Sequence, residues 1–413
     1  MGARDEVLSF VENHESWRGE CINLIASENI SSPSCNRAVG SGMMHKYAEG
    51  WPKQRYYQGC RWVDEAELCA NSQFYKLFKA DFVDLRPVSG ACANIALFFG
   101  MTQPGDTIMS LHTSHGGHIS HAEFGAAGLR GLRVVTFPYN NKEMNIDSDK
   151  MIKLIEEEKP KLVLFGCSLF LFPHPISEAR EAAEEVGAII CYDAAHVLGL
   201  MAGGEFQNPF EEGAKIITSS THKTFPGPQG GLIMIKDLPS DKAANLQWAT
   251  FPATVSNHHL HHVAAKGITG AEMAAFGKEY ASQVIRNAKA LGEALSEEGF
   301  HVVAEHRGFT ESHQIALDLK DFIGKWAAQT LERANIITNK NLLPWDPVEM
   351  SDNPSGMRLG TQEMTRLGMR ESEMKYIAEL FKKVILEKRK PEEIAEEVKE
   401  FRGEFQKVLY CFD

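Results

Sequence analysis

Short apolar strand patterns alternate with helical patterns from about Leu77 to Met234, and this alternation limits the fold more than any other feature of the chain. One repeat reads Lys161 to Phe165 as a strand, Ile176 to Val186 as a helix and Ala188 to Tyr192 as the next strand. Strands joined through helices pair in parallel, and the helices then cover both faces of the sheet. The sequence therefore predicts an α/β fold with a mostly parallel sheet.

The pattern changes after His262, where a long helical stretch without proline, Ala271 to Glu298, leads into a smaller α+β region. The tail, Val384 to Phe405, is dense in lysine and glutamate and predicts two solvated helices that meet near Pro391. A chain of 413 residues also exceeds what one hydrophobic core usually serves. We therefore expect an N-terminal helical arm over residues 1–48, a large domain over residues 49–275 and a small C-terminal domain over residues 276–413.

Lys223 follows a largely apolar run, Ala214 to Ser220, and precedes a glycine-proline turn, Gly227 to Gly231. At the end of a buried strand, desolvation can lower the pKa of an amine enough to make it a nucleophile. A lysine after a strand is more often a solvated loop residue. The pattern alone leaves both a Schiff-base lysine and a surface charge open.

Two further features favour the Schiff-base interpretation. Asp193 ends a short apolar strand, at the position where open α/β sheets bind ligands, and an aspartate there can keep a pyridine nitrogen protonated. Upstream, the small-residue turn Ser89 to Asn94 precedes an apolar run with helical character, so backbone amides and a helix dipole could bind a phosphate. The turn, the aspartate and Lys223 follow the chain order of fold-type I pyridoxal phosphate enzymes.

Seven motifs give the chain a resemblance to the serine hydroxymethyltransferase family, most closely to its archaeal branch, over nearly its whole length. These motifs are Leu24-Ile-Ala-Ser-Glu-Asn29, Lys46-Tyr-Ala-Glu-Gly50, Arg55-Tyr-Tyr-Gln-Gly59, Gly116-Gly-His-Ile-Ser-His121, Asp193-Ala-Ala-His196, Thr221-His-Lys-Thr224 and Ser355-Gly-Met-Arg-Leu-Gly-Thr361. The resemblance implies a fold-type I enzyme, with a mostly parallel sheet in a large domain and a smaller α+β C-terminal domain. It also implies reversible conversion of serine to glycine, with transfer of the one-carbon unit to tetrahydrofolate or tetrahydromethanopterin.

The resemblance assigns roles to individual residues around the cofactor. Lys223 would hold pyridoxal 5'-phosphate as a Schiff base, Asp193 would pair with its ring nitrogen, and His118 would stack on the ring. Further cofactor contacts are expected from Ser89, Gly90, Ala91, Ser168, His196, Ser220 and His222.

Other residues are expected to bind the amino acid and the pterin. Arg358 suits the substrate carboxylate, because a planar guanidinium matches two carboxylate oxygens. Glu49 would be the acid/base that acts on the hydroxymethyl group, which requires surroundings that raise its pKa toward neutrality. Further substrate contacts are expected from Ser27, Tyr47, Tyr57 and His196, and the pterin site from Glu49, Tyr56, Gly117, Ile119 and Asn341. In this family Glu49 and Tyr47 would reach the partner subunit's site, which implies a homodimer with shared active sites.

The chain departs from the common bacterial pattern in three places. Gln229 replaces an arginine, Ala91 replaces a hydroxyl residue in the phosphate turn, and Phe251 to Asn257 replaces a glycine-rich loop. These changes leave the amino-acid chemistry intact and leave both tetrahydrofolate and tetrahydromethanopterin open as the one-carbon carrier.

Two other functions compete with this interpretation. A pterin-independent threonine or β-hydroxy amino acid aldolase, or a threonine transaldolase, is suggested by Gly227-Pro-Gln-Gly230 and Gly308 to Gln314. A non-catalytic cofactor-binding protein would be expected to have lost Lys223, Glu49 or Arg358, all of which are present. The intact motifs around Glu49 favour the hydroxymethyltransferase.

Composition limits the partners and the compartment. The net charge of −12 argues against nucleic acid, and no apolar run approaches the roughly 18 residues that span a bilayer, so we expect neither nucleic-acid nor membrane partners. The eight cysteines form no Cys-x-x-Cys pair, and the first residues lack a signal peptide, which favours the cytoplasm. His258, His259, His261 and His262 could chelate zinc, but no nearby cysteine or carboxylate completes a site, so we expect no metal.

Overall fold

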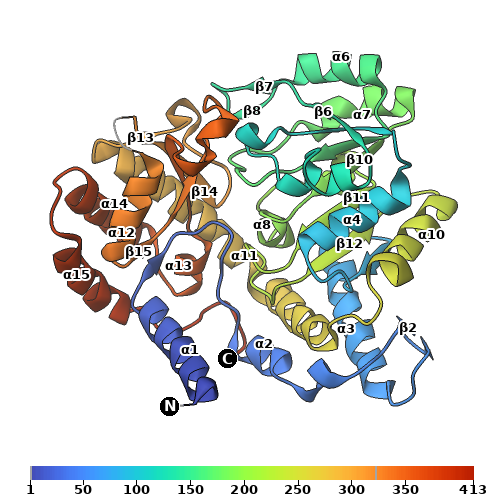
Figure 1. The fold of residues 1–413 in the computed structure, drawn as a ribbon, viewed down its shortest axis with the longest axis horizontal. Coiled ribbons are helices and arrows are strands. Elements are labelled where there is room, and N and C mark those ends of the chain that lie inside the picture. Colours follow the sequence, from blue (N-terminus) through green and yellow to red (C-terminus); the bar gives the residue numbers. More distant parts are fainter. Residues whose placement is uncertain (1, 321–322) are drawn as a thin grey trace. The chain divides into compact units, whose positions relative to one another are not determined.

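The computed structural model describes residues 2–320 and 323–413, which fall into two compact units (Figure 1). The smaller unit joins the residues up to Ala26 with Gln283–Leu409, and the larger unit comprises Ser27–Ser282 and Tyr410–Asp413. The division between them falls within one long helix, α11 (Leu260–Glu297). The functional domain ranges expected from the sequence stay a prediction.

The larger unit is built on a seven-stranded sheet (Figure 1). Its strands, in spatial order, are β4 (Phe82–Asp84), β12 (Gly231–Ile235), β11 (Ile216–Ser220), β10 (Ile189–Asp193), β9 (Leu162–Phe165), β5 (Thr107–Ser110) and β6 (Arg133–Thr136). The five strands from β11 to β6 are parallel, while β12 is antiparallel to both of its neighbours. The predicted mostly parallel sheet is confirmed.

Helices and apolar side chains bury this sheet. The helices of the larger unit are α2 (Pro33–Val39), α3 (Arg61–Phe78), α4 (Gly90–Met101), α5 (Ala126–Leu129), α6 (Ser148–Glu158), α7 (Ile176–Val186), α8 (Leu198–Ala202), α9 (Pro209–Glu212), α10 (Ser240–Trp248) and the first part of α11. Every residue of β9, β10, β11 and β12 is buried, as expected for strands covered on both faces. Leu97 and Phe98 of α4 pack in one core cluster with Ile108, Leu164 and Ile216 from three strands.

The smaller unit carries an antiparallel sheet. Its strands, in spatial order, are β13 (His301–Val302), β14 (Gln314–Asp318), β17 (Gly356–Gly360) and β16 (Asn339–Asn341). Its helices are α1 (Ala3–Gly19), α12 (Gly324–Arg333), α13 (Gln362–Arg366), α14 (Glu371–Ile385) and α15 (Pro391–Gly403), with β1 (Ile22–Asn23) parallel to β15 (Ile336–Ile337). The predicted C-terminal α+β region is thereby confirmed.

The tail differs from the prediction in one respect. The two predicted helices do meet near Pro391, but α14 begins at Glu371 and buries Met374, Ile377 and Phe381. These residues are three to four positions apart, so they form one apolar stripe along the helix. The lysine and glutamate residues of α14 lie on the opposite face. The helix is half-buried rather than solvated all round.

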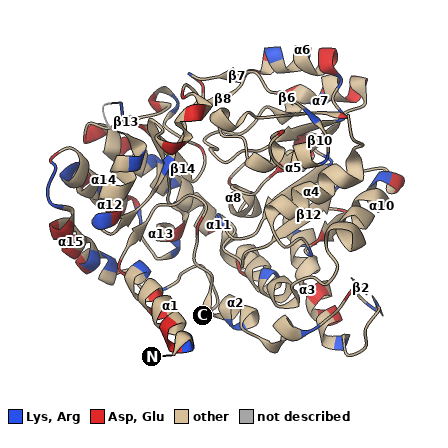
Figure 2. Ribbon diagram, in the orientation of Figure 1, with Lys and Arg blue, Asp and Glu red and all other residues tan. Residues whose placement is uncertain are grey.

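Charged residues gather on the outer helices, such as α6, α10 and α15, whereas the labelled strand β12 carries none (Figure 2). None of the helices in residues 2–320 and 323–413 combines the length and the apolar character that crossing a bilayer requires.

Candidate active site

The carboxyl ends of β10 and β11 bring the predicted cofactor residues together. Asp193 ends β10, and Ser220 ends β11, its parallel neighbour. The chain then reaches Lys223, which is half-buried, within three residues. The carboxylate and the amine predicted to bind the cofactor therefore lie at the same edge of the sheet, where open parallel sheets bind their ligands.

The amino terminus of α4 lies against the same edge. Ser89 is the N-cap, and its Oγ accepts a hydrogen bond from the backbone N–H of Cys92 at 3.0 Å. A Cβ atom added at Gly90 would lie 3.2 Å from the backbone nitrogen of Ser220, so only a small residue fits between α4 and β11. The helix dipole and the first backbone amides of α4 make this a favourable position for an anion.

A buried polar network holds the Asp193 carboxylate. Its Oδ2 accepts hydrogen bonds from Asn94 Nδ2 at 2.8 Å and faces His121 Nε2 at 3.0 Å, and its Oδ1 accepts from the Ala195 N–H at 3.0 Å. Burial by itself raises the pKa of this carboxyl, but the hydrogen bonds and the nearby histidines outweigh it and hold the pKa well below its usual range. Asp193 is therefore ionised at neutral pH.

His118 is linked to this network through one hydroxyl group. Its Nδ1 lies 2.7 Å from Ser120 Oγ, which also accepts a hydrogen bond from Asn94 Nδ2 at 2.9 Å. The preceding Gly117 has no room for a side chain, because a Cβ atom there would lie 2.1 Å from the carbonyl oxygen of Leu111. The Gly-Gly-His motif thus fixes the backbone before His118, and Ser120 links the His118 ring to the hydrogen-bonded pair Asn94 and Asp193.

The backbone around Lys223 is anchored on both sides. Asn29 Nδ2 donates to the Lys223 carbonyl at 2.6 Å, and Thr224 Oγ1 donates to the carbonyl of the buried His196 at 2.7 Å. Burial lowers the pKa of His222 to about 4, and its Nδ1 is buried with no hydrogen-bond partner among the described residues. This orphaned nitrogen leaves one polar position of the site for a ligand to satisfy.

Lys266 is a buried amine whose enclosure the sequence does not reveal. Its Nζ donates to the carbonyls of Leu85 at 2.7 Å and Gly231 at 2.8 Å, which joins the chain before Ser89 to the turn after Lys223. Burial lowers its pKa to about 7. Lys266 precedes the predicted helical stretch Ala271 to Glu298 but lies within α11, and no pattern around it indicates that its side chain is enclosed.

The remaining predicted residues of the larger unit lie in several environments. Ser168 is half-buried and its N–H donates to the Gly116 carbonyl at 2.6 Å. Ala91 and Ile119 are exposed, while Ser27 and Glu49 are half-buried. The tyrosines are exposed: Tyr47, Tyr56 and Tyr57.

Two predicted residues belong to the smaller unit. Arg358 lies in the centre of β17 and is buried, with 8% of its surface exposed. Asn341 ends β16, the strand that pairs with β17, and is half-buried. The roles assigned to both residues stay predictions.

The set of groups in the larger unit fits pyridoxal phosphate. An ionised buried carboxylate suits a protonated pyridine, the α4 amino terminus suits a phosphate, and Lys223 follows the strand beside Asp193. The histidine cluster differs from the expectation in one way: His258 Nε2 lies 3.2 Å from a carboxylate oxygen of Glu67, a partner 191 residues away in the chain. No group of three or more potential ligands with metal-binding geometry occurs in the described part of the chain.

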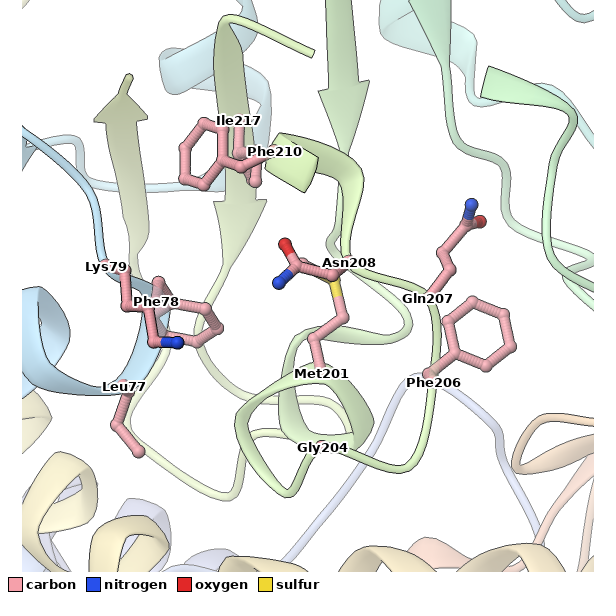
Figure 3. A pocket seen from close by; sticks show the side chains of 10 residues that line it. All are labelled: Leu77, Phe78, Lys79, Met201, Gly204, Phe206, Gln207, Asn208, Phe210 and Ile217. Carbon is pink, nitrogen blue, oxygen red and sulfur yellow. The ribbon is translucent and has the colours of Figure 1, made fainter. Parts of the chain in front are cut away.

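A separate pocket of about 200 Å³ lies elsewhere in the larger unit (Figure 3). Its lining comprises Leu77, Phe78, Lys79, Met201, Gly204, Phe206, Gln207, Asn208, Phe210 and Ile217. None of the predicted site residues is among them, so this pocket is not the candidate active site.

Comparison with known proteins gives a consistent result. The family model described as serine hydroxymethyltransferase matches residues 2–381. The serine hydroxymethyltransferase of Pyrococcus horikoshii is 62% identical over 99% of this chain and 97% of its own length, and that of Methanocaldococcus jannaschii is 54% identical over 98% and 94%. A crystal structure of L-threonine transaldolase from Pseudomonas fluorescens has a TM-score of 0.91 at 27% identity and covers 99% of this chain and 93% of that one.

Proposed function

Because the chain belongs to the serine hydroxymethyltransferase family, we propose that it converts serine to glycine reversibly with pyridoxal phosphate and passes the one-carbon unit to a reduced pterin. The observation that carries this proposal is full-length similarity to archaeal enzymes of that name, together with Asp193, Lys223 and the α4 amino terminus at one edge of the sheet. Each part of the proposed chemistry has a residue suited to it.

Pyridoxal phosphate, when bound, supplies an electron-withdrawing ring that stabilises negative charge at the α-carbon of the amino acid. Lys223 would hold it covalently, and the first backbone amides of α4, with Ser89, would bind its phosphate. The ionised Asp193 would keep a proton on the ring nitrogen, which sustains the electron demand. His118 would pack on the ring, in the orientation that Ser120 gives it.

The substrate would be oriented by charge and its proton moved by a carboxyl group. Arg358 offers a planar fork of donors for the amino-acid carboxylate. Glu49 is half-buried, a position from which a carboxyl group can take the proton of the serine hydroxyl as the carbon-carbon bond breaks and return it in the reverse direction.

The pterin would bind over Glu49, Tyr56, Gly117 and Ile119, with a contact from Asn341. Exposed aromatic and apolar side chains at Tyr56 and Ile119, 74% and 61% exposed, suit the flat ring of a pterin. Tetrahydrofolate and tetrahydromethanopterin share that ring, so both are candidate carriers.

We propose a cytoplasmic homodimer in which each site uses residues of both subunits. Large apolar side chains are exposed along one stretch of the larger unit, namely Met44, Tyr47, Tyr56, Tyr57, Trp62 and Leu68. This stretch includes the residues that the family carries into the partner's site, and a second copy of the chain would cover it. Gel filtration that gives only a fully active monomer would contradict this part of the proposal.

A second candidate is favoured by one observation, the likeness in fold to an L-threonine transaldolase. The test measures serine cleavage and threonine cleavage by the purified protein loaded with pyridoxal phosphate. Pterin-stimulated serine turnover supports the hydroxymethyltransferase. Threonine cleavage without pterin-stimulated serine turnover supports the aldolase or transaldolase.

A further inference from the structure

Every backbone carbonyl from Lys46 to Gly50, the segment that carries Glu49, accepts a hydrogen bond from outside the segment. The donors, in order along the segment, are Asn257 Nδ2 at 3.1 Å, Cys60 Sγ at 3.4 Å, Arg55 Nη1 at 2.8 Å, the Tyr56 N–H at 3.0 Å and Arg55 Nη1 again at 2.8 Å. None of these bonds involves the Glu49 carboxylate. The backbone is therefore fixed, and the carboxyl group takes no part in fixing it.

Asn257 binds this segment in both directions. Its Nδ2 donates to the Lys46 carbonyl, while its Oδ1 accepts from the Ala48 N–H at 3.0 Å. A side-chain amide that donates and accepts across one backbone stretch holds it as a neighbouring strand would. Asn257 belongs to the stretch that replaces the glycine-rich loop of the bacterial pattern, 209 residues away from Ala48 in the chain.

Arg55 holds the two carbonyls that flank Glu49, those of Ala48 and Gly50. Its side chain is 3% exposed, and its plane is fixed by Nε–H donating to Asp64 at 2.8 Å and Nη2–H donating to Glu67 at 2.6 Å.

His258 is the next residue in this buried hydrogen-bond network, because its Nε2 faces the same Glu67 carboxylate that accepts from Arg55. Burial raises the pKa of Glu67, but His258 and Arg55 outweigh it, so the net pKa is lowered and the carboxylate is kept as a partner for the guanidinium. The neighbours Asn257 and His258 thus support the Glu49 segment by two routes, one direct and one through Glu67 and Arg55.

Gly50 closes the segment with a conformation that only glycine adopts easily. Its φ is +102°, and a Cβ atom there would lie 2.5 Å from the Gln54 carbonyl oxygen. The turn between β2 (Gly50–Trp51) and β3 (Gln54–Arg55) therefore places Arg55 opposite Gly50, where its guanidinium reaches the carbonyls on either side of Glu49.

We propose that Asn257 and Arg55 are positioning residues for Glu49, and that Glu67 and His258 act by orienting Arg55. This inference rests on the proposed function, since it gives the acid/base carboxyl a fixed backbone. Its consequence is kinetic: a reacting group displaced by about 1 Å can lose as much as roughly a hundredfold in rate. Loss of Asn257 frees only the Lys46 to Ala48 end, so a smaller effect is expected than for loss of the Arg55 fork.

The experiment is a double-mutant cycle between Asn257→Ala and Glu49→Gln. Serine turnover, KM for serine and the visible absorbance of the bound cofactor are measured for the holoenzyme and for each variant. We expect Asn257→Ala to lower kcat about tenfold, with KM and absorbance nearly unchanged, and to add nothing in the Glu49→Gln background. Such non-additivity marks two residues that act as one unit.

Asn140→Ala is the matched control, because its Oδ1 also accepts from backbone amides, those of Lys142 at 3.1 Å and Glu143 at 3.2 Å, in a hairpin that holds no predicted site residue. It should leave kcat unchanged. Arg55→Lys, which keeps the charge but loses the fork, should lower kcat more than Asn257→Ala and also add nothing in the Glu49→Gln background.

Equal loss in both backgrounds, or no loss from Asn257→Ala, overturns the positioning proposal. Wild-type behaviour of Glu49→Gln also overturns it and removes the assigned role of Glu49, while leaving the family-level function in place. Absence of serine turnover by the unsubstituted holoenzyme is a different result, which refutes the proposed function itself.

Discussion

Replacement of Asn94 by alanine is expected to destabilise the larger unit and to remove one of the hydrogen bonds that hold the Asp193 carboxylate. Asn94 is 1% exposed; its Nδ2 donates to Asp193 Oδ2 at 2.8 Å and to Ser120 Oγ at 2.9 Å and lies 3.3 Å from His121 Nε2, while its Oδ1 accepts from Thr218 Oγ1 at 2.6 Å. A bond to a charged acceptor contributes about 2 kcal/mol and a neutral one about 1 kcal/mol. The free energy of unfolding should therefore fall by about 4 kcal/mol in Asn94→Ala.

The assay is urea unfolding at pH 7, followed by circular dichroism, with Asn140→Ala as the control. Asn140 is exposed and should cost less than about 1 kcal/mol. The pKa of Asp193 should also rise in Asn94→Ala, because one of its donors is lost. A loss below about 1 kcal/mol, equal to that of the control, would refute the claim that this network holds the carboxylate.

Three further predictions concern cofactor binding by Lys223, proton transfer by Glu49 and the pH dependence of stability. Lys223→Ala should abolish the visible absorbance of protein incubated with pyridoxal phosphate while leaving the far-ultraviolet circular dichroism unchanged, and retention of that band would contradict its role. Glu49→Gln should keep the absorbance but slow serine cleavage at least about a hundredfold, so kinetics like those of the unsubstituted protein would remove Glu49 from the mechanism. Burial lowers the pKa of His174 from 6.5 to about 3, so the unfolded state binds the extra proton between these values and stability falls as the pH drops through that window. One such group contributes at most about 1.4 kcal/mol of unfolding free energy per pH unit. Since His174→Asn removes the titrating imidazole, the loss of stability measured by urea unfolding between pH 6.5 and 4.5 should become less steep. An unchanged slope would contradict the lowered pKa of His174.

The elements that local pattern specifies were predictable. The α7 helix spans the predicted range, Ile176–Val186, because its apolar residues recur at helical spacing. The ends of β10 and β11 followed from short apolar runs, which is why Asp193 and Lys223 could be assigned to one edge of the sheet. The α4 helix begins five residues before the apolar run at Ile95, since Ser89 caps it and small residues fill its first turn.

Partners of buried polar groups could not be predicted in the same way. Asn94 meets Thr218 and Asp193 across separations of 124 and 99 residues, and no periodicity encodes such pairs. A buried asparagine or lysine has the same pattern in sequence as an exposed one until its acceptors are known. The contacts of Asn257 with Lys46 and Ala48 span 211 and 209 residues, so the sequence does not reveal them, although it marks the stretch Phe251 to Asn257 as a departure from the bacterial pattern.

The most direct test of the proposed function is the rate of serine-to-glycine conversion by the purified protein loaded with pyridoxal phosphate. Three reactions run in parallel: without pterin, with tetrahydrofolate and with tetrahydromethanopterin. We expect strong stimulation by one of the two pterins, which would also identify the carrier. No stimulation by either pterin, with threonine cleaved in the absence of both, would contradict the account and favour an aldolase or transaldolase.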